Sequence, residues 1–190
     1  MGRFGREVET MNVAVRRGFA QRCIGAALFR PDVYEEVEAD RSANTQATLV
    51  VLLSAVAAGL GTIANHGATG VLWYTAAALA SWYVWAAIAY WIGTRLLAVP
   101  STEADHGQLL RTIGFSSAPG VLRLFAFVPG IGAWVFLAST LWMLVAMVVA
   151  VRHALDYCTI GRAVAVCAIG FPFYAVILAY SLFLLGPWLI

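Results

Sequence analysis

Residues 47–64 read ATLVVLLSAVAAGLGTIA, and residues 71–94 read VLWYTAAALASWYVWAAIAYWIGT. Neither stretch contains a charged residue, and only the polar residues 65–70 separate them. A helix of about 20 apolar residues is long enough to cross the hydrocarbon core of a bilayer. The pattern therefore predicts two membrane-spanning helices, at about residues 44–64 and 71–97, joined by a turn at residues 65–70.

Two further uncharged runs are as long as the first two. Residues 124–151 and 163–190 contain no Asp, Glu, Lys or Arg, which predicts membrane helices at about 131–152 and 163–185. Hydrophobic residues make up 62% of the chain and charged residues 12%, whereas a soluble domain carries about 25% charged residues. The composition indicates an integral membrane protein. With a net charge of +2 and no basic stripe, a nucleic acid is not expected as a partner.

A fifth apolar segment, at about residues 113–128, is shorter than the others. As an α-helix it would measure about 24 Å, against a hydrocarbon core of about 30 Å. Ser116 or Ser117 is placed to cap a helix with Pro119 in its first turn, and Pro129 would end that helix. We therefore predict a short or broken third helix.

The arginines help to decide whether this third segment crosses the membrane. They gather in residues 3–41, 95–111 and 152–162. With about five crossings, all three groups lie on one side, which the positive-inside rule assigns to the cytoplasm. The sequence therefore predicts an all-α transmembrane domain at residues 42–190, with about five spans in the cell (inner) membrane. Its N-terminus is expected inside and its C-terminus outside.

The segment before the first span, residues 1–41, differs in kind because apolar residues alternate with arginines. It is typical of an amphipathic helix that lies in the membrane interface, with Arg16, Arg17 and Arg22 toward anionic head groups. The acidic residues 35–40 that follow are an alternative set of partners for these arginines. Such exposed ion pairs contribute only about 0–1 kcal/mol each.

Arg123 places a permanent charge inside the short third segment. A charge within the hydrocarbon is costly, and it usually either pairs with another group or serves a function. One interpretation is a contact to a lipid phosphate or an acidic substrate. The other is a side chain that reaches the membrane surface from a shallow helix.

His153 and Asp156 share a helix face at a spacing that could hold a metal ion. Two ligands do not make a site, and no third ligand is evident, so a polar helix end is the preferred interpretation and neither a metal nor a cofactor is predicted. The chain has no serine nucleophile motif, phosphate-binding glycine loop or HExxH pattern. We therefore do not expect an enzyme.

Several short motifs resemble the Yip family of Ypt/Rab-interacting membrane proteins. Gly114, Phe115, Ser116 and Pro119 match its Gly-aromatic-Ser-x-x-Pro signature, and further likenesses are residues 128–132, 151–155, 161–163 and 31–37. The last of these is similar to bacterial members. The resemblance implies about five spans. Eukaryotic relatives bind Rab-type GTPases through a cytosolic Asp-Leu-Tyr-Gly-Pro motif, which this chain lacks, so such a GTPase is not expected as a partner.

The leading hypothesis is a non-enzymatic membrane protein that organises lipids or scaffolds partner membrane proteins. The alternative is a small transporter or channel subunit that uses the broken third helix, because discontinuous helices often mark binding sites in transporters. Small residues spaced four apart in the first span, such as Ser54 with Ala58 and Ala57 with Gly61, suit either a homodimer or packing within the bundle.

Overall fold

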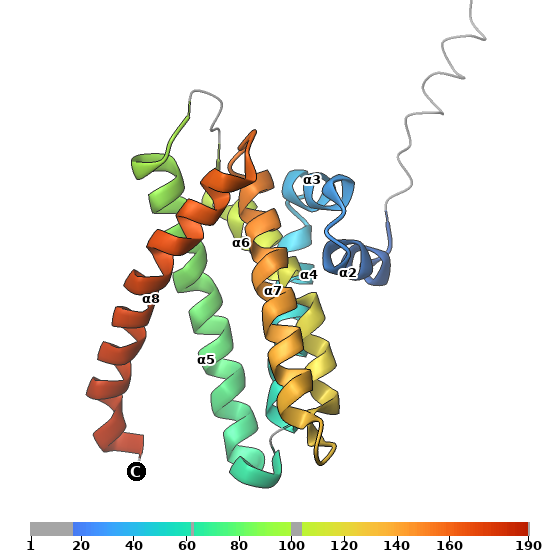
Figure 1. Ribbon diagram of the computed structural model, residues 1–190, viewed down its shortest axis with the longest axis vertical. Coiled ribbons are helices and arrows are strands. Elements are labelled where there is room, and N and C mark those ends of the chain that lie inside the picture. The colour runs from blue at the N-terminus through green and yellow to red at the C-terminus, as the bar shows by residue number, and fades with distance from the viewer. Residues whose placement is uncertain (1–16, 62, 100–103, 190) are drawn as a thin grey trace, which may run out of the picture.

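A computed structural model describes residues 17–61, 63–99 and 104–189. The regular elements in these ranges are all helical, with no strand among them, which confirms the predicted all-α class (Figure 1). In chain order they are α2 (Phe19–Ala27), α3 (Pro31–Ala39), α4 (Ala43–Gly61), α5 (Ile63–Trp91), the π-helical turn η1 (Ile92–Leu96), α6 (His106–Ser116), the 3₁₀ helix η2 (Ala118–Phe127), α7 (Gly132–Ala154) and α8 (Ile160–Leu189).

Three segments of the described chain are long and apolar enough to cross a membrane. They are Ala43–Gly61, Val71–Leu96 and Gly132–Ala154, which correspond to the first, second and fourth predicted spans. The last predicted span falls inside α8, where Ile160–Val176 forms a shorter apolar stretch. The lengths and compositions of these helices therefore agree with the membrane spans predicted at these positions.

The predicted turn at residues 65–70 is wrong, because the structure makes these residues part of α5. Polar residues and glycines lower helix propensity by at most about 1 kcal/mol each. Once a helix has begun, each further residue adds a backbone hydrogen bond at little cost, and α5 contains no proline to stop it. α5 therefore begins at Ile63 rather than Val71.

The third apolar segment is divided between two helices of different type. α6 ends at Ser116, Ser117 follows as a turn, and η2 begins with Pro119 at its second position. The hydroxyl of Ser117 makes no capping hydrogen bond, so the proline and the turn interrupt the helix without that cap. The predicted start at residue 113 is wrong, because α6 already begins at His106.

The two helices together are long enough to reach from one side of a bilayer to the other. An α-helix of the length of α6 measures about 16 Å at 1.5 Å per residue, and a 3₁₀ helix of the length of η2 about 20 Å at 2.0 Å per residue. The sum of about 36 Å exceeds a hydrocarbon core of about 30 Å. The earlier start and the 3₁₀ geometry make the helical segment longer than the sequence suggested, although its added first turns are polar and Arg111 there binds carbonyls of α3.

η2 lies between α4 and α7, and glycines allow the close approach. A Cβ at Gly61 would collide with the carbonyl oxygen of Arg123, and a Cβ at Gly132 would collide with that of Ala126. Gly120 likewise leaves room for the hydroxyl of Ser54. The small residues of the first span therefore pack against η2 within the bundle, which is one of the two roles expected for them.

The long helices run alternately between the two ends of the bundle, as Figure 1 shows. α4 ends and α7 begins at one end, where η2 also finishes. At the opposite end α5 and α7 finish, α8 begins, and the short helices α2 and α3 lie beside α6 and α7 (Figure 1). We call the pair α2–α3 the N-terminal cap.

The N-terminal cap is attached to the bundle by polar contacts as well as apolar packing. Tyr34, which is fully buried, donates its hydroxyl hydrogen bond to the carbonyls of Ala26 at 3.0 Å and Ala146 at 3.3 Å. Trp142 on α7 donates to the carbonyl of Ala27 at 2.7 Å. These contacts place α2 against the side of α7.

Gly114 lets α6 approach α4 closely. A Cβ added at this position would lie 2.7 Å from the Cβ of Ala47 and 3.2 Å from the ring of Trp82. We expect Gly114→Ala to force the two helices apart and to lower the free energy of unfolding by about 1–3 kcal/mol, the usual cost of overpacking a core. Detergent-solubilised protein titrated with SDS provides the measurement.

Gly161→Ala is the matched control, since nothing lies within 4 Å of the added Cβ near the start of α8. Its stability should stay the same or rise, because alanine favours a helix over glycine. Equal stabilities of the two variants would contradict close packing at Gly114.

Candidate functional site

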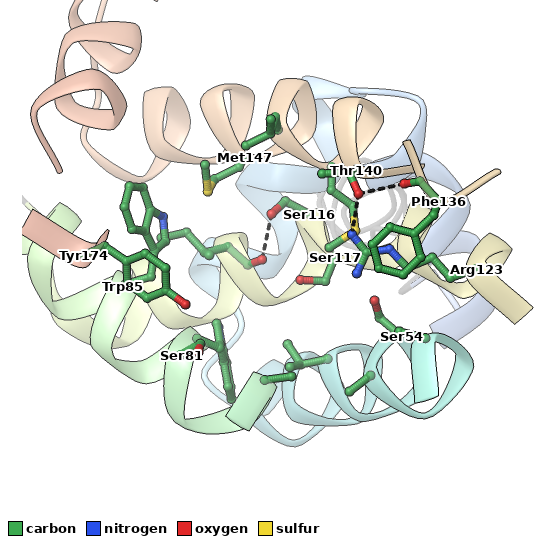
Figure 2. A pocket seen from close by; sticks show the side chains of 18 of the residues that line it. Ser54, Ser81, Trp85, Ser116, Ser117, Arg123, Phe136, Thr140, Met147 and Tyr174 are labelled. Atoms are coloured by element: carbon green, nitrogen blue, oxygen red, sulfur yellow. Dashed lines mark hydrogen bonds between the residues drawn. The ribbon is translucent and has the colours of Figure 1, made fainter. Parts of the chain in front are cut away.

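A cavity of about 420 Å³ lies between the helices of the bundle and is partly open to the outside. It is bordered by residues of α4, α5, α6, η2, α7 and α8, together with Ser117 of the turn, and its wall is mostly apolar (Figure 2). A volume of about 300–1,000 Å³ with few polar groups is typical of small-molecule sites. The wall also carries polar groups, namely the hydroxyls of Ser54, Ser81, Ser116, Ser117, Thr140 and Tyr174, the indole N–H groups of Trp82 and Trp85, and the guanidinium of Arg123.

Arg123 of η2 turns its guanidinium toward α7. Its Nε lies 3.3 Å from the hydroxyl of Ser139, and Nη2 lies 2.8 Å from the hydroxyl of Thr140. The guanidinium carbon stands 4.4 Å from the centre of the Phe136 ring, a cation–π contact. No carboxylate in the described chain forms an ion pair with Arg123.

Both hydroxyls that hold Arg123 have their own protons engaged. Ser139 donates to the carbonyl of Phe136 at 3.0 Å, and Thr140 donates to the same carbonyl at 2.7 Å. They therefore act toward Arg123 as acceptors, which fixes the direction of its side chain. Sequence analysis missed both residues, although they form the only adjacent polar pair in the run 124–151.

Two tryptophans of α5 stand in the cavity wall and differ in their hydrogen bonding. Trp82 donates to the carbonyl of Leu110 at 3.1 Å. Trp85 is 7% exposed and its ring meets Phe171 and Tyr174 edge-on, but its Nε1 has no acceptor among the described residues. A buried N–H without an acceptor costs about 1–3 kcal/mol.

The signature residues gather where α6 meets η2. Phe115 is fully buried in the core, Gly114 faces α4, and Pro119 is buried at the start of η2. Ser116 borders the cavity and donates its hydroxyl to the carbonyl of Ile113 at 2.7 Å. The signature therefore shapes the break in the third segment, and the cavity lies directly beside it.

The arginines of the N-terminal cap have carboxylate partners. Arg22 is 1% exposed and binds Glu36 at 2.8 Å and Asp40 at 2.9 Å, and it also reaches Gln46 at 3.0 Å. Arg17 pairs with Glu36 at 2.7 Å. The structure thus directs these two side chains to the acidic helix α3.

The charges in this cluster stabilise one another. Burial alone would raise the pKa of Glu36, but hydrogen bonds from Arg22 and Arg17 outweigh it and lower that pKa below its usual value. Burial would also lower the pKa of Arg22, yet its bonds to Glu36 and Asp40 raise it. Arg16, the third arginine proposed as a lipid contact, lies outside the described residues.

A second buried arginine, Arg111 on α6, ties α3 to the bundle. Its Nε donates to the carbonyl of Val37 at 3.0 Å, Nη2 donates to the carbonyl of Glu38 at 2.5 Å, and Nη1 donates to the side chain of Asn44 at 3.3 Å. These partners lie about 70 positions away along the chain, so no local sequence pattern predicts the contacts.

His153 and Asp156 do not meet further metal ligands in the structure. His153 stacks on Tyr34 with 5.8 Å between ring centres, and Asp156 occupies a turn with a positive φ of 51°. Within residues 17–61, 63–99 and 104–189, no group of three or more His, Cys, Asp or Glu side chains is placed to hold a metal ion.

Glu38 is a half-buried carboxyl group of the N-terminal cap. Burial raises its pKa from 4.5 to about 7, repulsion from Asp156 and Glu35 adds to the rise, and the attraction of Arg111 opposes it. The folded chain therefore holds this proton more tightly than the unfolded chain. Between pH 4.5 and about 7, the contribution of Glu38 to the free energy of unfolding falls as the pH rises.

We therefore expect Glu38→Gln, which stays neutral, to gain stability relative to the wild type as the pH is raised from 4 to 8. Unfolding of both proteins in detergent at a series of pH values measures this difference. A difference that does not change with pH would contradict the raised pKa of Glu38.

Comparison with known families gives one match for this chain. The family model of the Yip1 domain matches residues 25–185, a range that includes α3 to α7, most of the N-terminal cap and most of α8. No curated protein and no solved structure matches the chain.

Proposed function

The chain belongs to the Yip1 domain family, whose model covers most of its length, and from this premise we propose a non-enzymatic role. In this role the protein organises lipids, or scaffolds partner membrane proteins, from within the inner membrane. Family membership and the long apolar helices make it a membrane protein. Beyond this, we propose the number of membrane crossings, the orientation of the chain in the membrane, and the function of each of its faces.

Five crossings account for the arrangement of the helices. The broken segment α6–η2 runs beside α4 and α7, and at about 36 Å it is as long as a crossing requires. Figure 1 shows the ends of α5 and α7 and the start of α8 at the end that carries the N-terminal cap. Because Arg95, Arg152 and Arg162 belong to these ends, the positive-inside rule assigns this face to the cytoplasm.

The single observation that carries the lipid-organising role is the orientation of α2. Arg22 of α2 and the preceding Arg17 are turned inward to α3, while Ile24 and Leu28 are 61% and 59% exposed. Trp142 holds α2 against the side of the membrane helix α7. We propose that α2 lies in the cytoplasmic interface and inserts these two side chains among the lipids, in the manner of an interfacial helix.

The chemistry of the cavity supports a role without catalysis. Its polar wall consists of hydroxyl groups, indole N–H groups and one guanidinium, and its described lining contains no Asp, Glu, His or Cys. General acid–base catalysis usually needs one of these groups with a pKa near the working pH. The partners that fit are therefore lipids and other membrane proteins, rather than a substrate to be converted.

A small transporter is the second candidate, because the cavity lies beside a discontinuous helix. Transporters often place their binding site where a membrane helix is broken. The polar groups of the cavity come from α4, α5, α7, α8 and the α6–η2 segment. Flux of a substrate across vesicles that contain the protein would favour this candidate over the first.

The exposed Cys158, between α7 and α8, provides a test of the orientation. We expect a membrane-impermeant maleimide to label it in inside-out vesicles and not in right-side-out vesicles. Cys167 is buried, and burial raises the pKa of the Cys23 thiol to about 11, so both react poorly. Labelling should disappear in Cys158→Ser. Labelling from the outside would refute the proposed orientation.

The lipid-organising role is tested by vesicle shape. Wild-type protein reconstituted into phosphatidylcholine–phosphatidylglycerol vesicles should reduce their diameter in electron micrographs, because α2 inserts into one leaflet. We expect Ile24→Gln with Leu28→Gln to abolish this effect without unfolding the chain. Leu72→Gln with Trp73→Gln, at exposed positions of α5, is the matched control. If wild-type and cap variant give the same vesicles, the proposed role of α2 fails.

A further inference from the structure

Arg123 is a half-buried charge on the wall of the cavity, without a counter-charge among the described residues. Its partners Ser139 and Thr140 lie seven and eight residues into α7, which is about 11 Å from the start of that helix. Both partners are neutral, and the described residues of the chain supply no carboxylate to Arg123. A charged side chain at such a depth normally pairs with another charge or with a ligand.

The guanidinium keeps donors available for such a ligand. Of its five N–H groups, the structure engages one on Nε and one on Nη2. In the described chain Nη1 has no acceptor. Ser139 and Thr140 bind the guanidinium from the side of α7. Its remaining N–H groups are therefore available to a group that enters the cavity. Arginine binds carboxylate and phosphate oxygens in this two-pronged way.

The rest of the cavity is suited to an apolar chain. Figure 2 shows Arg123 and Thr140 at one end of the lining side chains, and Trp85 and Tyr174 at the other. Met143 and Met147 line the cavity on α7, and methionine adapts its shape to apolar ligands of different outline. A hydrophilic anion would satisfy Arg123 but would leave this long apolar wall without a partner.

The far end of the cavity is bordered by an aromatic side chain, Trp85. Trp85 is more than nine-tenths buried, stands in the cavity wall, and has an Nε1 without an acceptor in the part of the chain that the structure describes. Buried N–H groups nearly always have an acceptor. A hydrocarbon chain cannot supply that acceptor, so Trp85 can offer such a chain only the apolar surface of its ring.

From these observations we propose that the cavity binds a single-chain anionic amphiphile. Its oxyanion, a carboxylate or a phosphate, pairs with Arg123 beside Thr140, and its hydrocarbon chain extends between α5 and α7 toward Trp85. Ser139 and Thr140 are positioning residues, because their hydroxyls fix the orientation in which the guanidinium meets the oxyanion. The proposal goes beyond lipid organisation by the cap, because it assigns a specific bound molecule to the bundle and does not depend on α2.

The test is equilibrium binding to the full chain in nanodiscs of phosphatidylcholine. Radiolabelled palmitate, hexadecyl phosphate and hexadecanol are compared, since they carry the same chain with a carboxylate, a phosphate or no charge. We expect saturable binding of at least one of the two anions, and a dissociation constant at least about tenfold higher for hexadecanol, as one charged hydrogen-bonded contact implies. Whichever anion binds more tightly identifies the head group.

Two variants locate the binding. Arg123→Gln should weaken binding of the preferred anion at least about tenfold, whereas Arg162→Gln removes an exposed arginine outside the cavity and should leave binding unchanged. Ala78→Leu fills part of the cavity without touching any charge and should also weaken binding. If size-exclusion chromatography shows that Arg123→Gln does not fold, Ala78→Leu is the variant that tests the proposal.

Three results would overturn the proposal. They are equal binding of hexadecanol and the anions, equal binding by the wild type and a folded Arg123→Gln, and the absence of saturable binding for both anions. Because the cap variant Ile24→Gln with Leu28→Gln keeps the cavity intact, it should bind the anion normally. A failure of the cap experiment is therefore distinguishable from a failure of this one.

Discussion

The close packing of the 3₁₀ helix η2 between α4 and α7 is the constraint on which the rest of the bundle depends. Gly61, Gly120 and Gly132 leave the room that this packing needs. Runs of 3₁₀ helix beyond three or four residues are uncommon, so neighbours on both sides have to hold this one. Its extra rise completes the length of the third segment, and its position turns Arg123 toward α7. The cavity and the half-buried charge of Arg123 both lie beside this packed helix.

The N-terminal cap is held by a different kind of contact. Arg22 pairs with carboxylates of α3, while Arg111 donates to the carbonyls at the end of α3. A buried ion pair gains little net stability, because desolvation offsets the attraction, but removing one partner is strongly unfavourable. The Arg22 pairs therefore fix α2 against α3, and the Arg111 contacts fix α3 against α6. Together they define one position of the cap on the bundle. This fixed position is what turns the apolar side of α2 outward.

Much of the fold could be predicted from the sequence because membrane spans are recognised by length and composition alone. The first, second and fourth predicted spans agree with α4, the apolar part of α5 and α7. The start of α6 was missed because His106, Gln108 and Arg111 look like loop residues, although Asp105 and Gln108 form a capping box at the N-terminus of this helix. Arg123 was identified by its charge. Its neighbours Ser139 and Thr140, and the orphan N–H of Trp85, depend on contacts between segments far apart in the chain.

The helix type of η2 also links the protein to the thickness of its membrane. Rewinding its residues into an α-helix would shorten the segment by about 5 Å, because the rise per residue falls from about 2.0 to 1.5 Å. It would also rotate Arg123 by about 100° relative to Ala118, since each residue then turns about 100° rather than 120°. Cellular membranes differ in thickness by a few Å. The 3₁₀ winding of η2 thus matches the third segment to a thicker bilayer than the same residues would suit as an α-helix, and it places the guanidinium of Arg123 beside Ser139 and Thr140.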